Sequence, residues 1–368
     1  TSDNTNKTFA ATGDTLDSGA AVYLNGGVLV LTGTSTDAVV KADDAANSKT
    51  TSGTITLNSV ASAGAGTLVT YDDLEEGTFS KLDLNLNVFN AATGGTAGNV
   101  TIGESTKDLT IKEGTLKTGT IEGSSTAADK KAGIATITGK NLAFGVAPDP
   151  VGDKGETSVT NPGFAYDFDN AADVTLNVTA KETVQFNKGT ITNAGTMKVT
   201  GAKGVTVGKE VSIANTGDLT FTDTEAVNFN ADYTATAGHL VIKSAANTIY
   251  GNITADSLKF GAANTDLAKE TNQVVITGTT SNTIAYGSTV DVKALTVEDA
   301  ATTINGTLKA ATTAVTDKTT AGLTVVDTTG TTGKKQYAAV SLGDITVGSA
   351  ASGAQGNTSF TLTNQAEN

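Results

Sequence analysis

The stretch Asp173-Val-Thr-Leu-Asn-Val178 decides the fold, because related stretches follow it about every 22 residues. They begin at Gly195, Gly217 and Gly238. All but the last alternate apolar side chains with polar ones, and each starts beside a turn-forming residue. This alternation is typical of a half-buried β-strand, and the branched side chains of Thr and Val favour an extended backbone. The repeat therefore predicts equivalent β-strands at a constant spacing.

Two further strand patterns recur with the same period. One carries the apolar residues Val184/Phe186, Val205/Val207, Val227/Phe229 and Ile249. The other begins at Ile191, Ile213, Tyr233 and Ile253. Three short strands per period, each closed by a Gly, Asn or Asp turn, are the sequence pattern of a β-solenoid. We therefore expect an all-β chain with a β-solenoid or β-helix of about 22-residue rungs in its middle, flanked by further β-sandwich or solenoid regions.

The same patterns identify the residues that should point into the core. They are Val184, Val207, Phe221 and Phe229. In a solenoid each rung buries its apolar face only against the rungs above and below it. A charge at one of these positions is therefore expected to cost several kcal/mol locally.

The three prolines divide the chain into regions. Pro148, Pro150 and Pro162 fall in one short segment, and proline cannot donate to a sheet ladder. We expect an N-terminal all-β region over residues 1–147, a loop or linker over 148–165, the solenoid over 166–312, and a β-rich tail over 313–368. The alternative is that the proline segment is a loop protruding from one continuous solenoid.

Composition excludes several classes of partner. The net charge of −14 argues against nucleic acid, which requires clustered basic residues. No apolar run approaches the about 20 residues that a membrane span needs. The chain has no Cys, Trp or Arg, and roughly a fifth of it is Thr. This composition indicates an abundant exported protein.

Catalysis is not expected. The single histidine, His239, excludes most sites built on histidine pairs, and we expect it at the surface or at a strand end. A carbohydrate-active β-helix is the remaining enzyme class, with paired carboxylates as acid and base. The chain lacks the Arg and Trp that such sites use, so its carboxylate clusters are better explained as solvated turns.

Two acidic loops are candidate calcium sites. Asp149 and Asp153 flank one short loop, and Asp167 and Asp169 belong to a second. Calcium takes about six to eight hard oxygen ligands, which clustered aspartates supply. No other cofactor is expected.

The strings Ala301-Thr-Thr-Ile-Asn-Gly-Thr-Leu-Lys309, Gly195-Thr-Met-Lys-Val-Thr200 and Asp218-Leu-Thr-Phe-Thr222 resemble β-helical bacterial surface proteins. These are surface-layer proteins and the passengers of autotransporters. The resemblance implies an extracellular, non-enzymatic role.

A structural role in self-assembly is the leading hypothesis. A solenoid ends in an unpaired rung, which templates another chain unless it is capped. Phe360 and Leu362 lie in an alternating stretch that is suited to pair with a neighbouring subunit, although it can also close its own domain. The partner is then a second copy, in a surface layer or a filament.

The alternative function is an adhesin or receptor-binding shaft. Its binding tip would use the aromatic cluster Phe164, Tyr166 and Phe168, for which core packing is the other explanation. A cell-surface glycan is a further candidate partner.

Overall fold

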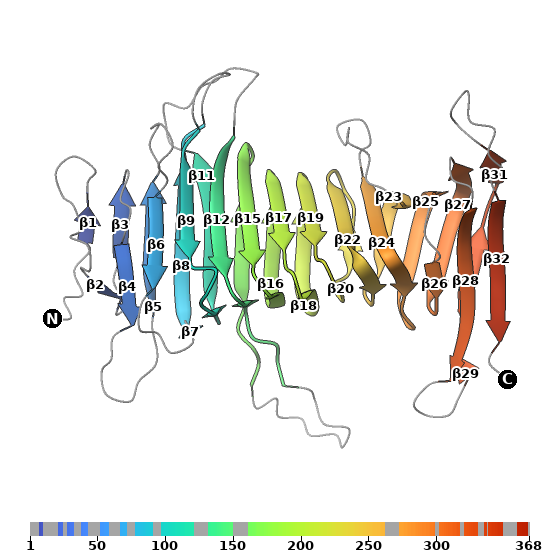
Figure 1. The fold of residues 1–368 in the computed structure, drawn as a ribbon, viewed down its shortest axis with the longest axis horizontal. Coiled ribbons are helices and arrows are strands. Elements are labelled where there is room, and N and C mark those ends of the chain that lie inside the picture. Colours follow the sequence, from blue (N-terminus) through green and yellow to red (C-terminus); the bar gives the residue numbers. More distant parts are fainter. Residues whose placement is uncertain are drawn as a thin grey trace. The chain divides into compact units, whose positions relative to one another are not determined.

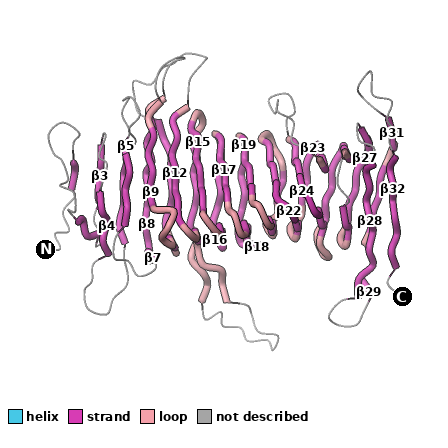
Figure 2. Tube along the Cα trace, viewed as in Figure 1, coloured by secondary structure: helices cyan, strands magenta, loops and turns pink. Residues whose placement is uncertain are grey.

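The computed structural model is all-β (Figure 1). It describes residues 7–9, 21–24, 28–32, 38–42, 52–58, 67–71, 78–90, 97–120, 132–149, 161–261, 272–298, 302–316, 320–329, 335–336, 338–348 and 359–366. These residues form strands, turns and loops, and none of them is helical (Figure 2). Accordingly, the described ranges contain no helix long and apolar enough to cross a membrane. The chain divides into two compact units, unit 1 (Thr1–Gly201) and unit 2 (Ala202–Asn368).

Unit 1 consists of three ladders of parallel strands. The first contains β1 (Lys7–Phe9), β3 (Val28–Thr32), β5 (Ser52–Asn58), β8 (Lys81–Val88), β11 (Gly114–Thr120), β14 (Tyr166–Asn170) and the end of β16 (Thr183–Asn193). The second contains β2 (Ala21–Leu24), β4 (Ala38–Ala42), β6 (Thr67–Tyr71), β9 (Asn99–Gly103), β12 (Gly133–Gly139), β15 (Val174–Ala180) and β17 (Thr196–Thr200). The third contains β7 (Thr78–Phe79), β10 (Leu109–Ile111), β13 (Leu142–Phe144) and the start of β16.

The N-terminal region of unit 1 is built from these parallel ladders. The sequence left a sandwich and a solenoid open for residues 1–147. The described strands of that region pair in parallel with strands that lie one repeat away, as in Thr110 with Thr78 and Leu109 with Leu142. The proline-containing segment 148–165 lies within unit 1, where Val146 and Phe164 form an antiparallel bridge.

Unit 2 also has three parallel ladders. The first contains β18 (Gly204–Asn215), β20 (Ala226–Phe229), the end of β22 (His239–Ile249), the end of β24 (Gln273–Ile284), β26 (Thr302–Ile304), β28 (Thr320–Thr329) and β32 (Ser359–Ala366). The second contains β21 (Tyr233–Thr234), β23 (Ile253–Phe260), β25 (Thr289–Val297), β27 (Thr307–Thr316) and β30 (Ala339–Leu342). The third contains β19 (Asp218–Thr222), then β22, β24, β23, β25, β27 and β31 (Ile345–Gly348). The short β29 (Lys335–Gln336) pairs antiparallel with β28.

Pairing in unit 2 follows the repeat that is visible in the sequence. Val205 and Val207 pair with Val227 and Phe229, and Asp218 pairs with His239. Parallel pairing of segments one repeat apart is consistent with a β-helix or solenoid. One departure occurs in the third ladder, where the first half of β24 lies between β22 and β23.

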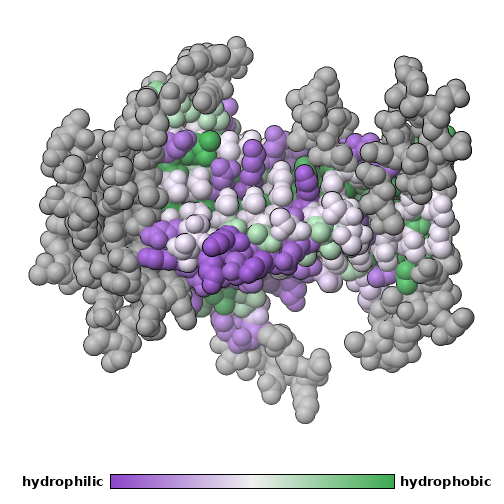
Figure 3. All heavy atoms as spheres, viewed as in Figure 1, coloured by the Kyte–Doolittle hydropathy of each residue, from purple (hydrophilic) through white to green (hydrophobic). Residues whose placement is uncertain are grey.

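The core is formed by the inward side chains of each strand. In β8, alternate residues from Leu82 to Val88 are buried, as the strict alternation predicts. Val184, Val207, Phe221 and Phe229, the four residues expected to point inward, are all 0% exposed. The outward positions carry polar and small residues, so the visible part of the described surface is mostly hydrophilic or intermediate in hydropathy (Figure 3).

Aromatic residues fill part of the core of unit 1. The rings of Phe144 and Tyr166 stack at 5.4 Å, and Phe168 meets Phe144 edge-on at 4.9 Å. Phe186 continues the cluster at 5.5 Å from Phe144. In unit 2, Phe221 and Phe229 lie 5.9 Å apart. Such pairs contribute beyond their buried area, about 0.5–1.5 kcal/mol each.

Candidate functional site

Three strands at the C-terminal edge of unit 2 are paired on one side within the described residues. β30 and β31 each pair with β27, and β32 pairs with β28. On their other side these three strands pair with no strand in the part of the chain that the structure describes. A sheet edge presents a row of N–H and C=O groups to which another strand can pair. We call β30, β31 and β32 the terminal edge.

Two apolar residues of the terminal edge are exposed. Ile345 pairs with Thr313, and Val347 pairs with Val315. Paired residues of a parallel ladder point to the same side of the sheet, so Ile345 and Val347 face the side that is core in β27. Thr313 and Val315 are 2% and 1% exposed, whereas Ile345 and Val347 are 50% and 47% exposed. The inward side of β31 is thus an apolar surface that is open to solvent.

The residues predicted for assembly lie on the same edge, in β32. Phe360 pairs with Ala321 and Leu362 pairs with Leu323, so one side of β32 is used within the chain. This pairing corresponds to the alternative that the sequence left open, a last strand that closes its own domain. The other side of β32 belongs to the terminal edge.

Sequence analysis did not identify Ile345 and Val347. The signal was present, because Ile345-Thr-Val347 alternates directly after the turn residues Gly343 and Asp344. This alternating pattern is the same whether or not another strand lies beyond the strand that carries it. Only the absence of a strand packed against β31 in the described residues distinguishes the two cases.

Three of the four predicted calcium ligands, Asp149, Asp167 and Asp169, lie in the described residues. Asp149 is exposed, and its N–H donates to the carbonyl of Asn161 at 3.1 Å. Asp167 and Asp169 lie on the outer side of β14, where Oδ1 of Asp167 accepts a hydrogen bond from the N–H of Thr190 at 2.7 Å. Asp153 lies outside the described residues. Within the ranges that are described, no group of three or more His, Cys, Asp or Glu could hold a metal ion. Calcium binding stays a prediction.

The three residues of the predicted aromatic tip lie in two different environments. Tyr166 and Phe168 are buried and pack in the core, whereas Phe164 is 45% exposed. Burial raises the pKa of the Tyr166 hydroxyl well above its ordinary value, and the nearby charge of Asp83 raises it further. Core packing is therefore what the structure supports for Tyr166 and Phe168.

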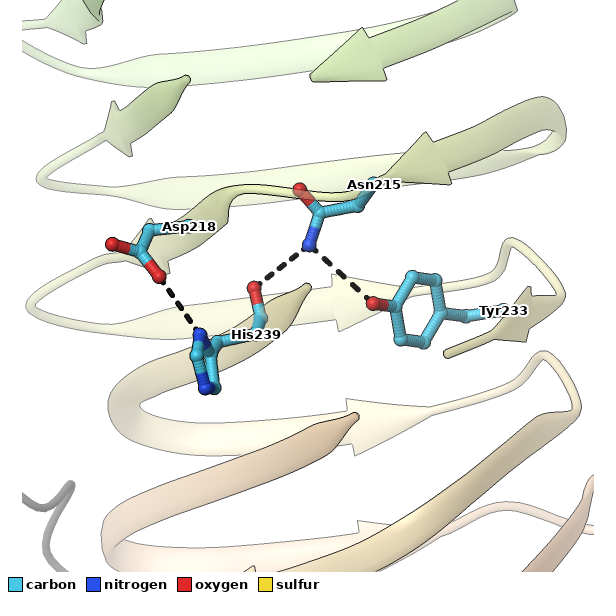
Figure 4. A network of polar contacts seen from close by, with 4 residues as sticks. All are labelled: Asn215, Asp218, Tyr233 and His239. Carbon is cyan, nitrogen blue, oxygen red and sulfur yellow. Dashed lines mark hydrogen bonds and ion pairs between the residues drawn. The ribbon is translucent and has the colours of Figure 1, made fainter. Parts of the chain in front are cut away.

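His239 belongs to a polar network within unit 2 (Figure 4). It is the first residue of β22, as expected, but its side chain is not at the surface. It is 8% exposed, and it pairs with Asp218 of β19 in the third ladder. Its Nδ1 lies 2.9 Å from Oδ1 of Asp218.

The second half of the network joins Asn215, the last residue of β18, to β21 and β22. Nδ2 of Asn215 donates to the backbone oxygen of His239 at 2.9 Å and lies 3.4 Å from the hydroxyl of Tyr233. Burial raises the pKa of Tyr233, while the hydrogen bond from Asn215 opposes this shift. Each buried polar group thereby gains a partner, which avoids a desolvation cost of about 1–3 kcal/mol per group. These hydrogen bonds support a structural role for His239, the single histidine of the sequence.

Comparisons with known proteins found no similar protein. No family model, no curated protein and no solved structure matches the chain.

Proposed function

We propose that the chain is a non-catalytic extracellular structural protein that self-assembles into a surface layer or filament through pairing of its terminal strands. The fold that goes with this proposal is a β-solenoid with rungs of about 22 residues in the middle. The observation that carries it is the terminal edge, where Ile345 and Val347 are half exposed although their partners in β27 are buried. Thr-rich, cysteine-free composition and the resemblance to surface proteins support the extracellular location.

The physical argument is that an added strand would cover this edge. A strand placed about 4.8 Å beyond β31 satisfies its free N–H and C=O groups. It also removes Ile345 and Val347 from water, and complete burial of such a side chain contributes about 1.5–3 kcal/mol. An edge that offers both main-chain and apolar contacts is a template for another chain.

A second copy can supply the added strands. β1 pairs only with β3, and β2 pairs only with β4, among the strands that the structure describes. The outer sides of β1 and β2 are therefore also free for pairing. Contact between the terminal edge of one copy and β1 and β2 of the next is head-to-tail. A head-to-tail contact forms a closed ring only if the rotation between successive copies closes. Otherwise it generates an open assembly.

A matched pair of variants tests the proposal. The double variant Ile345→Asp, Val347→Asp places charges on the inward side of β31. Thr346→Asp places one charge on the opposite side of the same strand, where the side chain is already exposed. We expect the double variant to raise the concentration needed for assembly by about a hundredfold, from the loss of about 3 kcal/mol. Thr346→Asp should assemble like the unmodified protein.

Assembly is measured by light scattering and electron microscopy, and folding by circular dichroism. A double variant that retains its β content and polymerises like the unmodified protein would contradict the proposal. An equal loss of assembly in Thr346→Asp would do so as well, because the effect would then not come from the inward side.

A further inference from the structure

A shallow groove crosses the outer face of the second ladder of unit 2. Its volume is about 410 Å³. Thr254, Asp291, Lys309 and Ser341 pair in sequence from β23 to β30 and line one side of it. Three strand spacings of about 4.8 Å give this row a length of about 14 Å. The alanines Ala235, Ala310 and Ala311 leave the groove open between taller polar side chains.

The groove carries balanced charge. Nζ of Lys293 lies 2.7 Å from Oδ1 of Asp256, and Nζ of Lys309 lies 4.0 Å from Oδ2 of Asp291. Two carboxylates and two ammonium groups therefore offer both acceptors and donors without a net charge. Lys293 is 80% exposed, so its remaining donors can reach a bound molecule. A neutral ligand rich in hydroxyl groups matches this set, whereas an anionic polymer would meet a chain with a net charge of −14.

Two exposed tyrosines stand at the start of the strands that form the groove. Tyr250 precedes β23 and is 50% exposed, and Tyr286 precedes β25 and is 56% exposed. Ile249 pairs with Ile284, so the two turns lie on neighbouring strands of one ladder. The N–H of Ala285 donates to the carbonyl of Ile249 at 2.8 Å, which fixes this arrangement.

The turns themselves do not require tyrosine. The residue that follows the ladder strand is Asn230 after β20 and Asn305 after β26, and each makes the same kind of backbone hydrogen bond as Tyr250. An exposed aromatic ring at position 250 is therefore not explained by the fold. Tyr286 lies one residue further along its own turn, after Ala285, which makes the equivalent hydrogen bond. Tyrosine combines a flat apolar face with a polar tip, which suits contact with a sugar ring.

We propose that β23, β25 and β27 form a binding site for a neutral polysaccharide. The groove supplies hydrogen bonds through Asp256, Asp291 and Lys293. Tyr250 and Tyr286 are outside the lining of the groove, in the turns that precede β23 and β25, and would supply stacking surfaces for a chain of sugars longer than the groove. A peptide is disfavoured at the centre of the groove, because β23 and β25 are paired on both sides at Thr254 and Asp291 and leave no edge there for main-chain pairing. The site shares one residue with the terminal edge, Ser341 of β30.

Native gel electrophoresis in gels that contain a soluble polysaccharide tests the site. The probes are galactomannan, xyloglucan and hydroxyethylcellulose, which are neutral, and alginate, which is acidic. We expect at least one neutral polysaccharide to retard the full-length protein, and alginate not to do so. The double variant Tyr250→Ala, Tyr286→Ala and the single variant Asp291→Asn should each weaken the retardation, by about tenfold in affinity for the tyrosine pair.

Ile134→Ala is the control, since it removes an exposed apolar side chain from unit 1 that no proposed site uses. It should bind like the unmodified protein. Thermal unfolding confirms that each variant is folded. Absence of retardation by all three neutral probes, retardation by alginate alone, or unchanged binding in the folded tyrosine variant would each overturn the proposal.

Discussion

Ile345 pairs with Thr313 in a parallel ladder, yet Ile345 is 50% exposed and Thr313 is 2% exposed. The two residues point to the same side of the sheet, so the difference arises from what lies beyond each strand. β27 is followed by β31, whereas β31 is followed by no strand in the described part of the chain. This difference is the structural basis of the assembly that we propose.

Val207→Asp should destabilise unit 2 strongly. Val207 is 0% exposed and pairs with Phe229, so the new carboxylate would be buried without a partner. We expect the free energy of unfolding to fall by about 3–5 kcal/mol, measured by urea denaturation. Thr206→Asp on the outer side of the same strand is the control and should change stability by less than about 1 kcal/mol. Similar losses in the two variants would show that Val207 does not face the core.

Asn170→Ala should destabilise unit 1. Asn170 is 0% exposed, accepts a hydrogen bond from Thr118 at 2.7 Å and donates one to Asn193 at 2.7 Å. Its removal leaves two buried polar groups without this partner, at a cost of about 2–4 kcal/mol in chemical denaturation. Asn177→Ala, at an outward position of β15, should have little effect. A neutral Asn170→Ala variant would refute this role.

Asp256 should titrate below its ordinary value. Hydrogen bonds from Lys293 and then Asn272 lower the pKa of Asp256 from 3.8. Because the pKa is lower in the folded chain, the interaction stabilises the fold above the unfolded pKa and is lost as the pH falls through the folded pKa. Lys293→Ala should raise this pKa in a carbon-13 NMR titration, whereas the exposed Lys209→Ala should not. An unchanged Asp256 titration in Lys293→Ala would contradict the ion pair.

Much of the fold could be predicted from the repeat. The four inward residues are buried, and the second pattern pairs as its period predicts, with Val207 opposite Phe229. In the first pattern, the repeat aligns Val174 with Thr196, but the structure pairs Thr175 with Thr196. The observed register therefore differs from the predicted one by one residue. Longer insertions separate some paired strands, as between Leu142 and its partner Val184, so the sequence shows no constant period there. For this reason the sequence did not decide between a sandwich and a solenoid before residue 148.

The insertion of β24 could not be predicted. Gln273 to Ile276 pairs with Ser257 to Phe260 on one side and extends the ladder from β22 on the other. This order reverses the sequence order of β23 and β24, so no repeat period describes it. All four residues from Gln273 to Ile276 are buried, and a run that is buried on both faces does not alternate.

The candidate sites were only partly visible in the sequence. The terminal edge was anticipated through Phe360 and Leu362, but the exposed pair Ile345 and Val347 depends on tertiary packing. The groove residues come from separate strands that only the ladder brings together, with Asp291 between Thr254 and Lys309.

Negative-stain electron microscopy of the purified, unmodified protein over a range of concentrations tests the central claim most directly. Self-assembly through terminal strands predicts open filaments or sheets that grow in number with concentration and are absent in the Ile345→Asp, Val347→Asp variant. Dispersed single particles at every concentration, from protein whose circular dichroism shows β structure, would contradict the account.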